Sequence, residues 1–104
     1  MTSIFLDDER FPPNDGKSWV VVRTVEEAQQ AVLACKDLTY VSFDHDLGGE
    51  QTGYDFAKWL VNHFLDHGIP DNFDFYVHSQ NCVGAVNIRE LLNQFLAMHR
   101  AGLL

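Results

Sequence analysis

The sequence predicts a single α/β domain over residues 1–104, built on a parallel sheet. Two observations and one general rule lead to this prediction. The chain contains four apolar, strand-like runs. From the second run onward, these runs alternate with amphipathic helical segments of roughly 10 to 15 residues. Strands separated by helices imply right-handed crossovers and therefore parallel pairing. Finally, polar clusters follow three of the four apolar runs, and ligands bind beyond the carboxyl ends of parallel strands.

The first part of the chain predicts two strands and one helix. Residues 3–6 (SIFL) form an apolar run, and residues 19–24 (WVVVRT) are rich in β-branched side chains, which favour strands. Between them, residues 11–16 (FPPNDG) contain two prolines and an Asn-Asp-Gly turn signal, so they predict a loop. A capping-box pattern begins at Thr24, and the helix that follows should cover residues 25–35.

The second part predicts two more strands and two helices. Residues 38–43 (LTYVSF) are a third strand, and a second capping pattern at Thr52 precedes a helix over residues 53–67, which ends at a Gly and a Pro. Residues 72–79 (NFDFYVHS) are the fourth strand, after which Asn81 can cap the last helix. The last helix has a wide apolar face made of Ile88, Leu91, Leu92, Phe95 and Leu96.

Composition and charge limit the possible partners. The formal net charge is −8, from 15 acidic and 7 basic side chains, so extended nucleic-acid binding is disfavoured, whereas a short nucleotide end or a small phosphate ester is not. No apolar stretch reaches the length of a membrane span, and the N-terminus lacks the pattern of a signal peptide. Cys35 and Cys82 have no metal-binding spacing and are expected to be reduced thiols in a cytoplasmic protein.

Acidic side chains end two of the predicted strands. Asp7 and Asp8 follow residues 3–6, and Asp44 follows residues 38–43. If these strands are neighbours in a parallel sheet, the three carboxylates meet at one rim, where they would repel one another unless a cation lies between them. Carboxylate oxygens suit Mg²⁺ or Mn²⁺, which also accept phosphate oxygens from a substrate. A divalent metal site is therefore predicted at this rim.

Polar side chains at the end of the fourth strand complete the predicted site. His78 is placed to act as a general acid or base, and Ser79 and Asn81 lie at a helix N-terminus, which favours an anion. His45, between two acids, is a second catalytic candidate, although alternation along the strand could turn it to the opposite side. Two further side chains could reach the rim and clamp a phosphate: Arg10 and Arg89.

These residues resemble the receiver domain of two-component signalling. In that family an acidic pair and an Asp at the end of the third strand hold Mg²⁺, and that strand-end Asp takes the phosphoryl group. The resemblance assigns Asp7 and Asp8 to the pair and Asp44 to the phosphoacceptor. It further assigns Asp46 to the position whose backbone carbonyl completes the metal shell. His78 stands where receivers have Thr or Ser.

The chain differs from an ordinary receiver in two respects. It lacks a fifth strand ending in the receiver Lys, and a loop replaces the helix between the first two strands. Its motifs, LDDERFPP, SFDHDLGG, TGYDFAKWL, VHSQN and VGAVNIRELLN, are similar to the cyclic-phosphate processing receiver domains over nearly the whole chain. The resemblance implies a shortened, three-layer receiver- or flavodoxin-like sandwich with three helices and four parallel strands in the order 2-1-3-4.

The function expected from residues and resemblance together is a metal-assisted phosphoesterase acting on a cyclic phosphate, such as a 2′,3′-cyclic end or a cyclic nucleotide. Two alternatives stay open. The chain could be a degenerate phosphorylated receiver, against which the missing Lys argues. It could also be a non-catalytic module that binds or inhibits a host or partner protein, for which a small acidic domain is suited.

Overall fold

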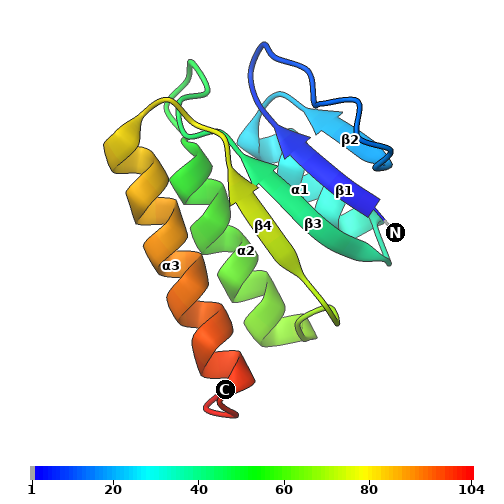
Figure 1. Ribbon diagram of the computed structural model, residues 1–104, viewed down its shortest axis with the longest axis vertical. Helices are drawn as coiled ribbons and strands as arrows, with labels where there is room; N and C mark the ends of the chain where they lie inside the picture. Colours follow the sequence, from blue (N-terminus) through cyan, green and yellow to red (C-terminus); the bar gives the residue numbers. More distant parts are fainter. Residues whose placement is uncertain (1) are drawn as a thin grey trace.

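The structure, a computed structural model, describes residues 2–104. It confirms the predicted fold class, a receiver- or flavodoxin-like α/β fold with a parallel sheet in the order β2-β1-β3-β4 and three helices (Figure 1). No helix among the described residues is both long and apolar enough to cross a lipid bilayer. Along the chain the elements are β1 (Thr2–Leu6), β2 (Trp19–Val22), α1 (Val25–Ala34), β3 (Leu38–Phe43), α2 (Gly53–His67), β4 (Asp74–Val77) and α3 (Cys82–Arg100).

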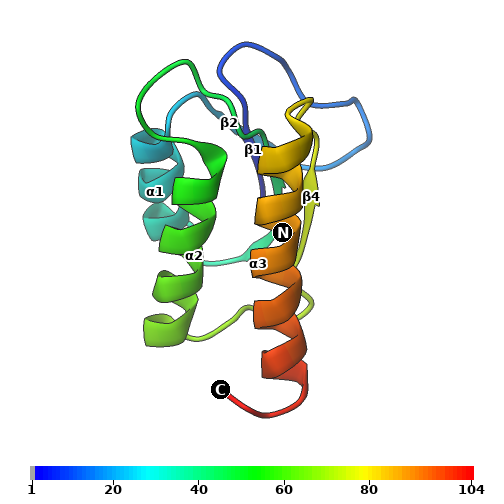
Figure 2. The same ribbon diagram turned by 90° about the vertical axis from the view of Figure 1, so that its left-hand side faces the viewer.

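All three helices lie on one face of the sheet. The connections β2-α1-β3 and β3-α2-β4 cross the sheet in the same direction, so right-handed crossovers place α1 and α2 on the same side. Helix α3 packs against α2 and completes that layer (Figure 2). The opposite face carries no helix within residues 2–104, and the third layer of the sandwich is reduced to the loop of residues 7–18, which bulges out on that side.

The distribution of layers explains which strands are buried. Strand β1, in the interior of the sheet, is buried along nearly its whole length, whereas each of the edge strands β2 and β4 is buried only at its last residue. Burial on both faces is therefore limited to the middle of the sheet. Strands β2 and β4 are also shorter than predicted, because their outer residues have no ladder partners.

The three helices begin at the predicted caps. The side chain of Thr24 accepts a hydrogen bond from a backbone N–H in the first turn of α1. Thr52 and Asp55 form a reciprocal capping box at the start of α2, with Thr52 N donating to Asp55 Oδ2 at 2.8 Å. Asn81 Oδ1 accepts from Gly84 N at 2.9 Å at the start of α3. Local side-chain chemistry thus fixes where each helix meets the rim of the sheet.

The core lies between the sheet and the helical layer and is rich in aromatic rings. Phe43 of β3 contacts Phe56 of α2 with ring centroids 5.7 Å apart, and Phe64 of α2 stacks on Phe95 of α3. The helices are amphipathic, as predicted, and turn their apolar faces to the core. Their buried members are Val25, Ala28, Val32, Phe56, Leu60, Phe64, Ile88, Leu92, Phe95 and Leu96, with Cys35, Trp59 and Leu91 partly buried.

Three polar residues extend the sheet by one hydrogen bond at the carboxyl end of its strands. Asp7 N donates to the carbonyl of the last residue of β2 at 3.1 Å, Asp44 N to that of β1 at 2.9 Å, and His78 N to that of β3 at 3.0 Å. All three therefore lie on the same rim, at the top of the sheet in Figure 1. The predicted convergence of these strand ends is confirmed.

Helix α2 passes so close to this rim that a side chain at its first residue has no room. A Cβ at Gly53 would collide with the backbone carbonyl of Asp44. Alanine normally stabilises a helix relative to glycine, but here we expect Gly53→Ala to lower the free energy of unfolding by about 1–3 kcal/mol, as overpacking does. Urea denaturation measures this change. Gly49→Ala, where a Cβ meets no atom within 4 Å, is the control; equal stabilities for the two variants would contradict the prediction.

Candidate functional site

Asp7 is the most deeply buried acid of the rim, with no solvent exposure. Its Oδ1 accepts from Glu9 N and Arg10 N, both at 2.9 Å, and its Oδ2 accepts from Arg10 Nε at 2.8 Å and from His78 Nε2 at 3.0 Å. Burial by itself raises the pKa of Asp7, but the two backbone N–H groups, His78 and Arg10 together outweigh it and hold the pKa below its usual value. Asp7 is therefore an ionised, fully hydrogen-bonded carboxylate.

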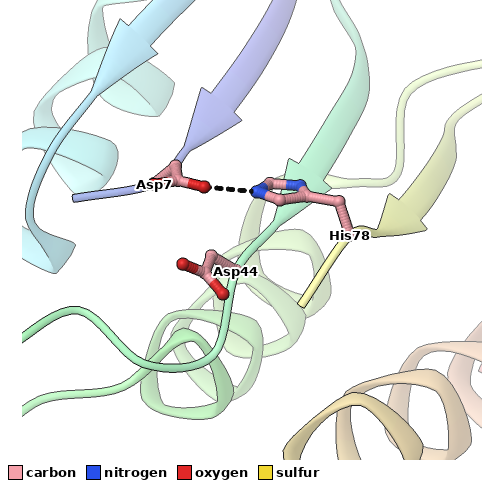
Figure 3. A group of neighbouring side chains, drawn as sticks. All are labelled: Asp7, Asp44 and His78. Atoms are coloured by element: carbon pink, nitrogen blue, oxygen red, sulfur yellow. Dashed lines mark hydrogen bonds and ion pairs between the residues drawn. The ribbon is translucent and has the colours of Figure 1, made fainter. Parts of the chain in front are cut away.

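His78 reaches from the end of β4 across β3 to Asp7, as Figure 3 shows. Its second ring nitrogen, Nδ1, lies 2.7 Å from Ser42 Oγ, and the ring stacks on Phe5 with centroids 4.5 Å apart. Because a carboxylate only accepts, the neutral ring carries its proton on Nε2, and Nδ1 accepts from the Ser42 hydroxyl. Burial lowers the pKa of His78, although the nearby Asp7 carboxylate partly opposes this. Both ring nitrogens are thus occupied within the protein.

Ser42 is the site residue that the sequence interpretation missed. It is buried near the carboxyl end of β3, two positions before Asp44, and it provides the hydrogen bond that orients His78. The signal that could have revealed it is the pleat, since residues two apart on a strand point to the same side of the sheet. A polar residue at this spacing between apolar neighbours, such as the Ser in LTYVSF, indicates a partner on that side.

Asp44 completes a cluster with Asp7 and His78, here called the Asp–Asp–His cluster (Figure 3). Asp44 is 5 % exposed, and its Oδ1 accepts from His45 N at 2.8 Å. One ligand atom from each of the three residues lies within 4.8 Å of the others, which is close enough to share one ion. Carboxylates suit Mg²⁺ and Mn²⁺, and an imidazole nitrogen suits transition metals, so the set fits Mn²⁺ better than Mg²⁺.

Arg10 lies against the two carboxylates of this cluster. Besides the bond from Nε to Asp7, its guanidinium places Nη2 3.6 Å from Asp44 Oδ2. Burial alone would lower the pKa of Arg10, but the two carboxylates outweigh it and raise the pKa above its usual value. Arg23 Nη1 donates to the backbone carbonyls of Asp7 and Arg10 and so holds the loop that carries Arg10.

A pocket of about 380 Å³, here called the rim pocket, opens beside the cluster. Asp44 lies in its wall, so the pocket and the cluster share one residue. The pocket brings together most of the side chains that the sequence predicted for metal and substrate. The predicted residues that line it are Asp8, Arg10, Asp44, Asp46, Ser79 and Asn81.

His45 forms a second imidazole–carboxylate pair with Asp46, which lines this pocket. Its Nδ1 lies 2.9 Å from Asp46 Oδ1, and Asn81 Nδ2 donates to both oxygens of Asp46. The hydrogen bond from His45 and those from Asn81 lower the pKa of Asp46. Within residues 2–104, His45 Nε2 has no hydrogen-bond partner. Helix α3 accommodates the ring because position 84 is glycine, where a Cβ would collide with His45.

Two of the four predicted metal ligands lie outside the Asp–Asp–His cluster, and one predicted phosphate ligand lies outside the rim pocket. Asp8 is exposed and lines the rim pocket, but its carboxylate is not among the mutually close ligand atoms. The carboxylate of Asp46 is also outside that group and is engaged by His45 and Asn81. Arg89 is exposed on the second turn of α3 and does not line the pocket. The sequence could place these residues near the rim, but not the direction of their side chains.

Comparison with known protein families agrees with the motifs. The family model described as "Cyclic-phosphate processing Receiver domain" matches residues 2–94, a span that contains every strand and all members of the cluster and the rim pocket. No curated protein and no solved structure matches the chain. The family similarity inferred from the sequence is thereby confirmed.

The buried state of His78 predicts a loss of stability in mild acid for the metal-free protein. The pKa of His78 is lower in the folded state than its ordinary value of 6.5, so the unfolded chain takes up the proton first as the pH falls. The free energy of unfolding should therefore decrease below about pH 6.5, by at most about 1.4 kcal/mol per pH unit from this group. Urea denaturation in EDTA between pH 5 and 7.5 measures the effect.

The matched variants for this experiment are His78→Asn and His99→Asn. Replacing His78 should flatten the pH dependence, whereas replacing His99, exposed near the end of α3, should leave it as in the wild type. Parallel pH profiles for all three proteins would contradict the assignment of His78 as a buried neutral imidazole.

The Asp–Asp–His cluster predicts stabilisation by Mn²⁺. An ion that binds only the folded state contributes RT ln(1 + [L]/Kd), about 2.7 kcal/mol at a hundredfold excess over Kd. Asp44→Asn should lose most of this gain, and Asp66→Asn, on the exposed end of α2, should keep it. Thermal unfolding with and without millimolar Mn²⁺ is the measurement. A wild-type melting temperature that does not change when Mn²⁺ is added would contradict the metal site.

Proposed function

The chain belongs to the family of cyclic-phosphate processing receiver domains, and on that premise we propose that it hydrolyses a cyclic phosphate bound in the rim pocket. The observation that carries the proposal is that Asp44 belongs both to the Asp–Asp–His cluster and to the wall of the pocket. A phosphate in the pocket would therefore lie next to the residues that can hold a divalent cation. The substrate class is a small cyclic phosphate ester or a cyclic nucleotide end.

The protein's own residues divide the binding tasks. Asp7, Asp44 and His78 would hold Mn²⁺ or Mg²⁺, which when bound supplies Lewis acidity toward phosphate oxygens. Arg10 brings guanidinium N–H donors to the pocket, a geometry that suits phosphate oxygens. Asn81 lies at the first turn of α3, where the helix dipole favours an anion.

Hydrolysis of a cyclic phosphate requires two proton transfers. Oxygen of a water molecule forms a bond to phosphorus and one ring P–O bond breaks, while the water gives up a proton and the leaving oxygen receives one. A side chain that moves these protons needs a ring nitrogen that is not already hydrogen-bonded. Within residues 2–104, His45 Nε2 has no hydrogen-bond partner, while its Nδ1 is engaged by Asp46, which lines the pocket.

His78, which the sequence favoured for this role, is less well suited. Its Nε2 is bonded to Asp7 and its Nδ1 to Ser42, so proton transfer to a substrate would first have to break one of these bonds. We therefore assign proton transfer to His45, oriented by Asp46, and assign His78 to holding the cation. This division resembles other sites in which a carboxylate fixes the orientation of a catalytic imidazole. To bind a cation through Nε2, the His78 ring would carry its proton on Nδ1 instead and donate it to Ser42 Oγ.

Turnover of cyclic phosphates tests the proposal. We expect wild-type protein with Mn²⁺ to open the ring of 2′,3′-cyclic or 3′,5′-cyclic nucleoside monophosphates. The reaction can be measured by ³¹P NMR or chromatography. His45→Gln should lower the rate by about 10²- to 10⁴-fold, because a general acid or base is lost, while stabilisation by Mn²⁺ stays unchanged. His78→Gln should lower both the rate of turnover and the stabilisation by Mn²⁺. His99→Gln is the control for a distant histidine.

The alternatives give different outcomes. Binding of a cyclic phosphate without turnover would indicate a binding module and overturn the catalytic assignment. A stable phosphoryl adduct on Asp44 after treatment with acetyl phosphate, detected by mass spectrometry, would indicate a phosphorylated receiver instead.

A further inference from the structure

We infer that Arg10 is a built-in counter-ion of the metal site: its guanidinium neutralises Asp7 and Asp44 when no metal is bound and moves to the phosphate of the ligand when a divalent cation binds. This inference rests on the proposed function, because it assumes that the Asp–Asp–His cluster takes a cation. It adds a coupling between metal and phosphate that the family similarity does not contain.

The first support is the position of the guanidinium. Arg10 contacts the same two carboxylates that supply the acidic ligand atoms of the cluster, Asp7 at 2.8 Å and Asp44 at 3.6 Å. Two buried carboxylates this close to each other are costly unless a positive charge lies beside them. A guanidinium in that place would be repelled by a divalent cation held by the same oxygens. The two cations therefore exclude each other.

The second support is that the side chain of Arg10 can move while its backbone stays fixed. Arg10 N donates to Asp7 Oδ1, and Arg23 holds the carbonyl of Arg10, so the main chain is bonded on both sides. The side chain is 41 % exposed and lines the rim pocket. Rotation about its own side-chain bonds is enough to take the guanidinium from the carboxylates into the pocket.

The third support is the charge of the pocket wall. Asp8, Glu9, Asp44 and Asp46 line the pocket, and Arg10 is its only cationic lining residue within residues 2–104. A phosphate entering the pocket needs Arg10, yet in the metal-free protein Arg10 is engaged by Asp7 and Asp44. Binding of a divalent cation releases Arg10 for the phosphate, and phosphate that draws Arg10 away opens the carboxylates to the cation. By linkage each ligand strengthens binding of the other.

The affinity for Mn²⁺ alone tests the competition. Arg10→Gln removes the competing charge, so it should bind Mn²⁺ at least about fivefold more tightly than the wild type, equivalent to about 1 kcal/mol. Arg100→Gln, at the far end of α3, changes the net charge equally and should leave the affinity as in the wild type. Arg10→Lys keeps a cation at this position and should fall between the wild type and Arg10→Gln. Free Mn²⁺ measured by electron paramagnetic resonance gives the constants.

The affinity for a phosphate diester tests whether metal binding releases Arg10 from the carboxylates. Dimethyl phosphate, a stable anion with the single charge of a cyclic phosphate, should bind the wild type more tightly when Mn²⁺ is present. In Arg10→Gln it should bind more weakly than in the wild type at saturating Mn²⁺. If Arg10→Gln binds Mn²⁺ more tightly and the phosphate diester more weakly than the wild type, the same guanidinium serves both sites. A merely misfolded variant would lose both, and circular dichroism of Arg10→Gln checks its fold.

The outcomes separate the inference from the proposed function. If the wild type binds Mn²⁺ and Arg10→Gln binds it no more tightly than Arg100→Gln does, the inference is overturned and the metal site stands. If Arg10→Gln binds Mn²⁺ and the wild type does not, the inference is supported in its strongest form. If none of the variants binds Mn²⁺, the metal site is wrong and the inference falls with it.

Discussion

Four hydrogen bonds converge on the carboxylate of Asp7, and they fix different parts of the site. Two backbone N–H groups turn the loop after β1 back toward the sheet, the guanidinium of Arg10 lies against one oxygen, and His78 is drawn across from β4. A buried carboxylate without such partners would cost several kcal/mol, so the loop, the arginine and the imidazole are held in place by the same requirement. The ionised state of Asp7 is the constraint on which the arrangement of the rim depends.

Much of the fold follows from local sequence. Apolar runs, capping residues and the spacing of helices predicted the elements, the parallel sheet and the rim at which Asp7, Asp44 and His78 meet. These features depend on short-range chemistry and on the handedness of crossovers, both of which a single sequence carries. The absence of helices from one face of the sheet could not be predicted in the same way, because an apolar strand has the same composition whether one or both of its faces are covered.

The details of the site were less accessible from sequence. The acidic pair suggested that Asp7 and Asp8 act together, but adjacent residues point in different directions, so Asp7 is buried and Asp8 lies in the pocket wall. Ser42 escaped notice because a serine inside a strand carries no motif. The division of work between His45 and His78 depends on which ring nitrogens are already bonded, and that is a property of three-dimensional contacts alone.

The backbone N–H groups of Asp7, Asp44 and His78 each make the last hydrogen bond of the sheet. Displacing any of these residues would open the end of a strand, so their mutual geometry is established when the sheet forms and needs no ordering when a ligand arrives. The conformational entropy of the three ligand residues is thus lost in folding rather than in binding, which favours affinity. Only the long, half-exposed side chain of Arg10 has to change position, so the anionic half of the site is a rigid frame and its cationic half is the adjustable part.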